Sequence, residues 1–291
     1  MKYAYYPGCS LSETAKEFDA ATRLVMERLG AELVDIPDWT CCGASAAEAV
    51  SELLSLALPG RNLALAGQEV PDHDILAPCS ACYLNLQRVV RKTERDPELR
   101  ARLNEALEGQ GLRLPEAMRV RRLLDVLVND AGLERIREEV SAPLEGMQVA
   151  PYYGCQILRP YAEFDDPERP ETMAAVLKAL GAAPLDWEFA ARCCGASLMA
   201  SKKEAALPLA GAILKGARLA GADAVATVCP LCQMNLEAYQ SEADPEAREV
   251  QTVVYLPQLM GLAFGMSPRD VMLEKNMSVA RDFLVPAPAE A

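Results

Sequence analysis

Short apolar runs and longer stretches with an apolar side chain at every third or fourth position follow one another along the first half of this chain. The short runs end at turn residues or at a cysteine, as buried strands do, and the longer stretches have the spacing of amphipathic helices. The predicted strands are residues 2–6, 32–36 and 74–77, and the predicted helices are residues 18–29, 43–58 and 80–92. Strands that alternate with helices in this way predict an α/β fold with parallel sheets.

The second half has the same order of elements. Residues 148–153 and 224–228 are strand-like, and residues 173–180 form an amphipathic pattern that ends at Gly181. Between them, Pro184–Asp186 leads toward a pair of adjacent cysteines. Because the elements recur in order, the pattern predicts a duplicated domain.

The repeat divides the chain into two predicted domains, residues 1–140 and 146–291, each a Rossmann-like unit with a parallel sheet. We expect pseudo-twofold symmetry to relate them. Three finer expectations concern single segments. The dipeptide Pro59-Gly60 should break or kink its helix, residues 93–115 should form a surface helix and loop, and residues 271–284 should form a helix packed on the chain's own surface.

All ten cysteines repeat in register. Each half holds one single cysteine, one adjacent Cys-Cys pair and one C-x-x-C motif, separated by 31 and 36 residues in the first half and by 37 and 34 in the second. Tyrosines and a glycine precede the single cysteine, a glycine follows each pair, and Asn-Leu begins three residues after each C-x-x-C motif. The two sets are Cys9, Cys41, Cys42, Cys79 and Cys82, and Cys155, Cys193, Cys194, Cys229 and Cys232.

Composition places these thiols in an ordinary soluble protein. The chain has 291 residues, of which 51% are hydrophobic and 24% charged, and no apolar run approaches the roughly 18 residues that would cross a bilayer. The N-terminus lacks the apolar region of a secretory signal, so we expect a cytoplasmic location, reduced thiols and no direct membrane insertion. The formal charge of -13 argues against nucleic-acid binding, which depends on Lys and Arg.

Iron-sulfur clusters explain the pattern better than the other thiol chemistries. Tetrahedral zinc takes four ligands, usually from two close pairs, and would leave a fifth thiol over in each half. A thiol-disulfide oxidoreductase would use the C-x-x-C motif alone, and inert buried cysteines would not repeat in register. Five thiolates also exceed the four that an ordinary cubane takes. The spacing therefore leaves open an unusual cluster or one cysteine per half that is non-ligating or bridging.

The spacing of the single cysteine, the Cys-Cys-Gly triplet and the C-x-x-C motif, present twice, resembles the CCG domains of the heterodisulfide reductase B subunit. The resemblance covers nearly the whole chain. It implies two noncubane [4Fe-4S] clusters, one per domain, each bound by the five cysteines of its half. The first set is Cys9, Cys41, Cys42, Cys79 and Cys82, and the second is Cys155, Cys193, Cys194, Cys229 and Cys232.

The resemblance also implies an oxidoreductase that acts on a sulfur group as part of a complex. A disulfide, such as the mixed disulfide of coenzyme M and coenzyme B, would lie between the clusters and take one electron from each, since its reduction to two thiols needs two. The chain has no ferredoxin-type cysteine run and no dinucleotide-binding fingerprint. Electrons would therefore come from partners, which the resemblance identifies as the iron-sulfur C subunit and the flavin-containing, iron-sulfur A subunit of heterodisulfide reductase.

Electron transfer without disulfide chemistry is the alternative function, because CCG domains also occur in subunits of quinone-, fumarate- and sulfur-linked oxidoreductases. Basic residues near the second motif could attract an anionic substrate, but solvated surface charges are the more common case. They are Arg159, Arg192, Lys202 and Lys203. The single histidine, His73, lies in the loop before a predicted strand and is interpreted as solvated, with proton relay as the less favoured role.

Overall fold

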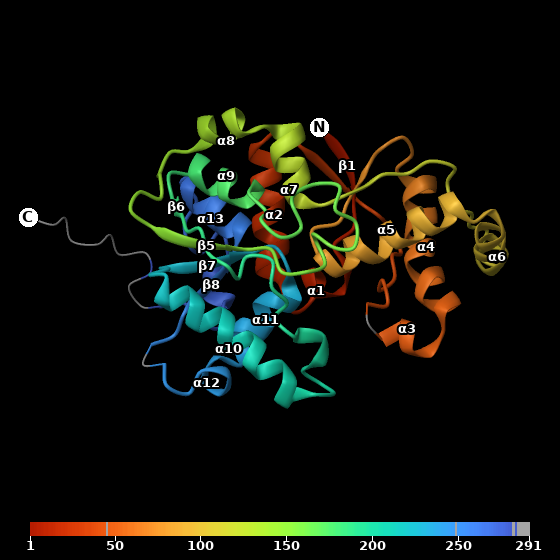
Figure 1. The fold of residues 1–291 in the computed structure, drawn as a ribbon. Coiled ribbons are helices and arrows are strands. Elements are labelled where there is room, and N and C mark those ends of the chain that lie inside the picture. Colours follow the sequence, from red (N-terminus) through yellow and green to blue (C-terminus); the bar gives the residue numbers. More distant parts are fainter. Residues whose placement is uncertain (45, 248, 281–282, 284–291) are drawn as a thin grey trace, which may run out of the picture.

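Two four-stranded parallel sheets, one in each half of the chain, form the framework of the computed structural model (Figure 1). The structure describes residues 1–44, 46–247, 249–280 and 283. The strand orders are β2-β1-β3-β4 and β6-β5-β7-β8, which are the same order in the two halves. The α/β prediction with two parallel sheets is thus confirmed.

The first sheet contains the three predicted strands and one that was not predicted. Its strands are β1 (Lys2–Tyr5), β2 (Glu32–Asp35), β3 (Ile75–Leu76) and β4 (Val120–Arg121). In register, Tyr5 pairs with Leu76 and Leu76 with Arg121. Strand β4 has only two residues, and both of its neighbours in sequence are arginines, so it carries little strand signal.

Helices follow each strand of the first half. They are α1 (Gly8–Ser12), α2 (Lys16–Arg28), α3 (Ala46–Val50), α4 (Glu52–Glu69), α5 (Ser80–Arg95), α6 (Pro97–Glu108), α7 (Leu123–Val126), the π-helix η1 (Leu127–Ala131) and α8 (Leu133–Glu139). The helix predicted within 93–115 is α6, which buries Leu103 and Leu107.

A break or a kink was predicted at Pro59-Gly60, and the break was wrong, because α4 continues through both residues. Pro59 and Gly60 are buried, and a Cβ on Gly60 would lie 3.6 Å from the Leu114 side chain. Tertiary packing therefore holds the helix together where one backbone hydrogen bond is missing. Helix α10 of the second half passes through Pro208 in the same way.

The second half repeats the arrangement with fewer helices. Its strands are β5 (Gln148–Tyr152), β6 (Ala183–Pro184), β7 (Ala224–Thr227) and β8 (Thr252–Tyr255). Its helices are α9 (Thr172–Ala179), the 3-10 helix η2 (Ala196–Leu198), α10 (Lys203–Leu219), α11 (Pro230–Ala238), α12 (Gln240–Ala243), α13 (Leu256–Ala263) and the 3-10 helix η3 (Leu273–Lys275). Strand β8, like β4, was not predicted.

The expected helix at 271–284 is a second correction. Within the described part of this segment the only helical turn is η3, although Val271 and Leu273 are buried against the chain's own core. The segment thus packs on the chain's own surface as predicted, but it consists of turns and one short 3-10 helix and not of an α-helix. Residues 281, 282 and 284 of the predicted helix lie outside the described residues.

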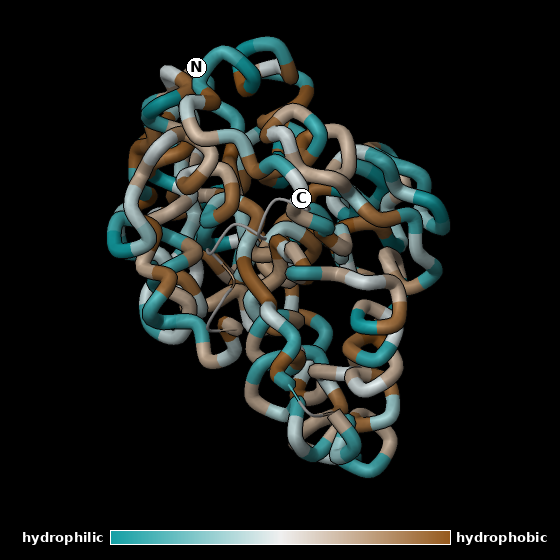
Figure 2. Tube along the Cα trace, turned by 90° about the vertical axis from the view of Figure 1, so that its left-hand side faces the viewer, coloured by the Kyte–Doolittle hydropathy of each residue, from teal (hydrophilic) through white to brown (hydrophobic). Residues whose placement is uncertain are grey.

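The two halves meet through helices that follow their first and last strands. Helix α2 packs on α13, and α9 packs on η1 and α8. In each contact a helix that follows the first strand of one half meets helices that follow the last strand of the other half. In Figure 1, α9 and α13 lie beside α2, to the left of the centre. This reciprocity agrees with pseudo-twofold symmetry. Hydrophobic stretches run through the interior of both halves, and the outer turns are mostly hydrophilic (Figure 2).

Candidate functional site

The carboxyl ends of the two central strands of each sheet bring the cysteine motifs together. Cys9 lies in α1, shortly after the end of β1, and Cys79 follows the end of β3, which pairs with β1. Cys155 and Cys229 likewise follow the paired strands β5 and β7. Because parallel strands end at one edge of the sheet, each half gathers its thiols there.

The five thiols of the first half are in contact as a chain. The sulfur atoms of Cys9 and Cys41 are 3.7 Å apart, and Cys42 hydrogen-bonds with both Cys41 and Cys82. Cys82 in turn hydrogen-bonds with Cys79. All five residues predicted for the first site therefore lie together.

The second half gathers its thiols in nearly the same way. The sulfur atoms of Cys194 and Cys232 are 3.6 Å apart, Cys229 hydrogen-bonds with Cys232, and Cys155 with Cys193. The charges of Cys194 and Cys229 also act on Cys155. The five residues predicted for the second site thus lie together as well.

Exposure divides each set in the same manner. The single cysteine and the first member of the pair reach the surface, whereas the second member and both C-x-x-C thiols are buried. The accessible thiols are Cys9, Cys41, Cys155 and Cys193, with Cys155 only partly exposed. Each site therefore has a buried inner side and an outer side open to another molecule.

In each half, contacts with the cysteines explain why two positions are occupied by glycine. Gly8 and Gly154 have φ of +68° and +69°, and a Cβ there would lie 2.7 Å from the Cys82 sulfur and 3.0 Å from the Cys232 sulfur. The glycines after the Cys-Cys pairs donate their amides to Cys41 at 3.5 Å and to Cys193 at 3.4 Å. The close approach excludes a side chain, and the amides stabilise negative charge on sulfur.

A tyrosine before each single cysteine holds the residue that precedes each Cys-Cys pair. The Tyr6 hydroxyl donates to the Thr40 carbonyl at 2.7 Å, and the Tyr152 hydroxyl donates to the Arg192 carbonyl at 2.8 Å. Burial raises the pKa of both tyrosines well above the usual value, and so do the neighbouring cysteines. The repeat of tyrosines was visible in the sequence, but their role in holding the loop was not predicted.

An asparagine after each C-x-x-C motif anchors the Cys-Cys pair from the opposite side. The Asn85 side-chain amide donates to the Cys42 carbonyl at 3.3 Å, and that of Asn235 donates to the Cys194 carbonyl at 2.8 Å. Asn85 also lies 3.6 Å from the Cys42 sulfur. The recurring Asn-Leu dipeptide was the sequence signal for these residues, although it did not reveal their partners.

The pKa values of the thiols indicate which cysteines form a thiolate most readily. Hydrogen bonds from Cys41 and Cys82 lower the pKa of Cys42 to about 3 despite its burial. In the second half, a hydrogen bond from Cys155, the Gly195 amide and the charge of Arg159 lower the pKa of Cys193 to about 6. Thiolates are the metal-binding form of cysteine, so both pairs are suited to metal ligation.

The four basic residues noted in the sequence have different surroundings. The Arg159 guanidinium donates to the carbonyls of Ala191 and Pro167 and pairs with Glu168. Lys203 pairs with Glu242 at 2.7 Å, and the side chains of Arg192 and Lys202 are exposed. Of the four, Arg159 is the one whose charge acts on a cysteine.

The histidine lies apart from these contacts. The Nδ1 atom of His73 is 2.7 Å from the Pro71 carbonyl, in the loop before β3. No thiol is among the hydrogen-bond partners of His73 in the described chain, so the geometry favours the interpretation as a loop residue over proton relay.

The segments that carry the C-x-x-C motifs meet at the junction of the halves. The Ser80 hydroxyl donates to the Val228 carbonyl at 3.4 Å, and these residues adjoin Cys79 and Cys229. Tyr255 is buried at the same junction, where burial is the main cause of its raised pKa and the charges of Glu17, Cys229, Glu237 and Cys79 add to it. The inner sides of the two sites are thus neighbours across the junction.

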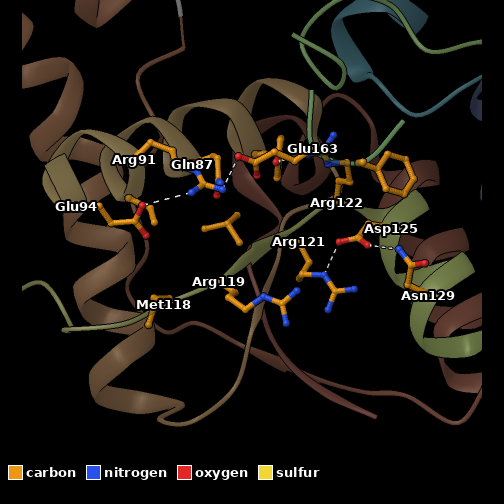
Figure 3. A pocket seen from close by; sticks show the side chains of 14 residues that line it. Gln87, Arg91, Glu94, Met118, Arg119, Arg121, Arg122, Asp125, Asn129 and Glu163 are labelled. Carbon is orange, nitrogen blue, oxygen red and sulfur yellow. Dashed lines mark hydrogen bonds and ion pairs between the residues drawn. The ribbon is translucent and has the colours of Figure 1, made fainter. Parts of the chain in front are cut away.

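An arginine-rich cavity of about 460 Å³ opens beside this junction. Figure 3 shows side chains reaching it from α5, from the β4 segment and from the loop that holds Glu163. Arg91 pairs with Glu163 at 2.5 Å, and Arg121 pairs with Asp74, Asp125 and Asp130. The sequence interpretation missed these arginines because charged residues near a short strand look like a surface loop.

The donor set fits an iron-sulfur group better than a single metal ion. Each half offers five sulfurs, amide donors beside them and glycines that leave room against the C-x-x-C thiols. Sulfur ligation with nearby amide donors is the chemistry that iron-sulfur clusters use.

The fold and sites define a class of protein, a tandem α/β protein with one cysteine-rich centre per domain. The chain belongs to the cysteine-rich domain family known as CCG, whose model matches residues 3–87 and 149–237. Both matches contain a complete set of five cysteines.

Relatives of known designation extend along nearly the whole chain. The chain is 34% identical over 281 residues to the 8-methylmenaquinol:fumarate reductase membrane anchor subunit of Wolinella succinogenes, covering 95% of this chain and 96% of the relative. It is 27% identical over 290 residues to the B subunit of ferredoxin:CoB-CoM heterodisulfide reductase of Methanosarcina mazei, covering 97% and 96%. The resemblance to the heterodisulfide reductase B subunit is thus confirmed.

A solved structure shares the fold. A hypothetical protein from Helicobacter pylori superposes with a TM-score of 0.73 at 17% identity, covering 96% of this chain and 52% of that chain. This chain therefore spans about half the length of that protein, and at this identity the likeness concerns the fold alone. None of the helices in the described ranges is both long and apolar enough to cross a membrane.

Proposed function

We propose that this chain is the iron-sulfur subunit of a multi-subunit oxidoreductase and that its two sites together reduce a disulfide to two thiols. The relatives named as subunits of reductase complexes support the coarser part of this proposal. The observation that carries the finer part is the assembly of five thiols in each half, with two of them accessible at each site. A disulfide offers one sulfur to each of two such sites.

The proposed ligands are the ten cysteines, and the proposed cofactors are two noncubane [4Fe-4S] clusters. A cluster bound in each half would supply one-electron transfer and iron to hold a substrate sulfur. The chain's own groups have separate roles. The buried C-x-x-C thiols hold the inner side, and the Gly43 and Gly195 amides stabilise negative charge on the outer thiolates.

Disulfide cleavage consumes two electrons and two protons, and each product is a thiol. The proposed source of electrons is a partner of the iron-sulfur C type, fed in turn by a flavin-containing partner of the A type. The mixed disulfide of coenzyme B and coenzyme M, which appears in the designation of the Methanosarcina mazei relative, is the first substrate to test. The cytoplasm remains the predicted location.

Metal content and turnover test the proposal together. Protein purified without oxygen should contain about eight irons with equivalent sulfide, as two four-iron clusters require. The double variant Cys41→Ala/Cys42→Ala and its counterpart Cys193→Ala/Cys194→Ala should each lose half of the iron. With reduced viologen dye as donor, the intact protein should reduce the mixed disulfide, and each double variant should not. Iron without turnover of any disulfide would contradict the disulfide chemistry.

Quinol-linked electron transfer is the second candidate, and the 34% identity to a menaquinol:fumarate reductase subunit favours it. In that case the two sites would pass electrons from a membrane quinol to a partner. Oxidised protein mixed with vesicles that contain a reduced menaquinone analogue would then become reduced within turnover time. A protein that reduces disulfides but takes no electrons from the quinol would contradict this second candidate.

A further inference from the structure

Arg122 is a buried cation in the lining of the arginine-rich cavity of Figure 3. Its exposed fraction is 4%, and its guanidinium lies 4.3 Å from the Tyr83 ring centroid and 5.0 Å from the Phe164 ring centroid. It donates to the Tyr83 hydroxyl and to the Ile157 carbonyl, the latter at 2.5 Å. Both acceptors are neutral, and a buried charge without a counter-ion is costly, so an anion that reaches Arg122 would be strongly stabilised.

The other charged side chains that line the cavity already have partners of opposite charge. Each lining carboxylate is paired with an arginine, and each lining arginine other than Arg122 is paired with at least one carboxylate. Within the described ranges, Arg122 is thus the one charged group of the lining without such a partner, so the unpaired charge is positive. The pairs are Arg91 with Glu94 and Glu163, Arg119 with Asp74, and Arg121 with Asp74, Asp125 and Asp130. Two of these aspartates also accept hydrogen bonds from neutral donors, Asp125 from Asn129 and Asp130 from Tyr3.

Two further polar groups of the lining lack hydrogen-bond partners. Gln87 is only 6% exposed and lines the cavity beside Arg91 (Figure 3), and its side-chain amide makes no hydrogen bond within the described chain. The Nε atom of Arg91 is buried and has no partner either. Buried polar groups are nearly always hydrogen-bonded, so two such groups in one cavity indicate a site for a molecule that accepts hydrogen bonds.

Helix α5 arranges these groups in one row. Tyr83, which holds Arg122, is followed by Gln87 and Arg91 at intervals of four residues. Residues at this spacing share one face of a helix, about 6 Å apart along its axis. An oxyanion beside the Gln87 amide would therefore have Arg122 on one side and the Arg91 Nε atom on the other. Guanidinium groups suit this task, because their planar N–H groups match the oxygens of phosphate and carboxylate.

Aromatic rings take the equivalent position in the second half. Tyr255 corresponds to Arg122, since each precedes the helix after the last strand of its half. Phe18 corresponds to Phe164, nine residues after the single cysteine. The rings of Tyr255 and Phe18 are buried and stack at 4.3 Å. Both halves assemble five thiols, so the arginine-rich cavity serves something other than that assembly.

We propose that this cavity binds an oxyanion group, namely a phosphate, sulfonate or carboxylate, through Arg122, Gln87 and the Nε atom of Arg91. Its volume of about 460 Å³ is in the range of small-molecule sites, so an organic anion fits. The source is either a free anion or an anionic arm of the disulfide substrate, which share this recognition chemistry. Only the second source rests on the proposed function. Tyr83 directly follows Cys82, so the bound anion lies near the first cysteine site.

Binding of simple anions tests the site. Protein purified without oxygen is titrated calorimetrically with inorganic phosphate, methanesulfonate and acetate, at constant ionic strength in chloride buffer. We expect saturable binding of at least one of these anions, with one per chain. Arg122→Gln and Gln87→Leu should each weaken this binding at least tenfold, because each removes a donor to the anion. Arg122→Lys keeps the charge and should restore part of the affinity.

Arg119→Gln is the matched control, because Arg119 lines the same cavity but has a side chain that is 72% exposed and paired with Asp74. It removes the same charge as Arg122→Gln and should change the affinity less than twofold. An equal loss in this control would indicate diffuse attraction, and binding that neither cavity variant weakens would be adventitious. Either result, or no saturable binding of any of the three anions, would overturn the inference. If Arg122→Gln fails to fold, Gln87→Leu decides alone.

Competition distinguishes the two sources of the anion. If the mixed disulfide displaces the bound anion, and Gln87→Leu raises the KM for the disulfide without changing kcat, the cavity holds an arm of the substrate. If anion and disulfide bind independently, the ligand is a free anion. The anion titration needs neither electrons nor a disulfide, so it gives the same answer whether or not the proposed disulfide chemistry fails.

Discussion

Phe18 and Tyr255 stack with their ring centroids 4.3 Å apart and their planes inclined by only 2°, although they come from opposite halves of the chain. Both rings are almost completely buried. The stack lies where α2 packs on α13, beside the segments that carry Cys79 and Cys229. The packing of the two halves at this stack therefore helps to set the distance between the two cysteine sites.

Removing the Phe18 ring should weaken the whole protein. Phe18→Ala deletes a fully buried aromatic side chain and leaves a cavity, so we expect it to lower the free energy of unfolding by about 3–5 kcal/mol. Phe164→Ala is the control, because its ring is only partly buried. Denaturant unfolding of both variants under reducing conditions provides the comparison. Equal losses would show that the stack has no special role.

The glycine before each single cysteine should be essential for its own site. Gly8→Ala and Gly154→Ala would place a Cβ at 2.7 Å and 3.0 Å from a C-x-x-C sulfur. We expect each variant to lose the iron of its own half and to keep that of the other, measured as iron and sulfide per chain.

Gly30→Ala separates this effect from backbone strain. Gly30 has φ +77°, but a Cβ there would meet no atom within 4 Å. Because alanine is strained in this left-handed conformation, the Gly30→Ala variant should lose about 1 kcal/mol of stability. Its iron content should stay unchanged. Iron loss from Gly30→Ala would mean that strain alone disrupts the sites.

The sequence was sufficient to predict which cysteines gather, because a duplication keeps their positions relative to the strands. Cys9 and Cys79 follow strands that the apolar pattern identifies, and parallel strands must end at one edge. The ligand assignment itself remains a prediction, as do the domain limits at 140 and 146. Strand β4 was not predicted because its two residues lie among arginines, and β8 was not predicted because it runs without a turn into the apolar helix α13.

Contacts between the halves could not be predicted from spacing. Nothing in the sequence near Arg122 indicates that its guanidinium reaches the Ile157 carbonyl, 35 residues away. Residues 141–144, which join the two predicted domains, also contact the second half, where Ser141 donates to Ala263 and Leu144 to Leu180. Such contacts depend on how two folded domains pack on each other, and the hydrophobic periodicity of the sequence carries no information about that packing.

The first cysteines of the two Cys-Cys pairs, Cys41 and Cys193, are both exposed and should react differently in cluster-free, reduced protein. A hydrogen bond from Cys155 lowers the pKa of Cys193 to about 6, whereas the hydrogen bond with Cys42 and burial raise the pKa of Cys41. At pH 7 Cys193 is therefore mostly thiolate and Cys41 is mostly thiol, and the thiolate is the nucleophile. Alkylation by iodoacetamide, followed by peptide mass spectrometry, should modify Cys193 first.

Arg159→Gln tests the electrostatic part of this difference. It removes a charge that lowers the Cys193 pKa, so alkylation of Cys193 should slow severalfold while that of Cys41 stays constant. The reverse order of modification in the unaltered protein would contradict the assignment of the thiolate.

Glu237 is a buried carboxyl group at the junction of the halves. Burial is the main cause that raises its pKa to about 7, the charge of Glu17 adds to the shift, and hydrogen bonds from Ser278 and Gln233 oppose it. The Ser278 amide donates to Glu237 at 3.1 Å, and the side-chain oxygen of Gln233 is buried without a hydrogen-bond partner. Burial therefore costs the ionised form of Glu237 more than these two hydrogen bonds return.

Glu237→Gln should make the protein more stable at alkaline pH. The folded pKa of about 7 lies above the unfolded value of about 4.3. Between these values the folded state binds more protons than the unfolded state. The contribution of Glu237 to the free energy of unfolding is therefore favourable below pH 4 and is lost as the pH rises through 7. The glutamine cannot ionise and keeps the shape, so the variant should exceed the unaltered protein in stability by at most about 4 kcal/mol at pH 8 and match it near pH 4. Denaturant unfolding across this range, with the exposed Glu242→Gln as control, measures the difference. A variant that is less stable at pH 8 would show that the Glu237 carboxylate is stabilising, and the proposed pKa would then be wrong.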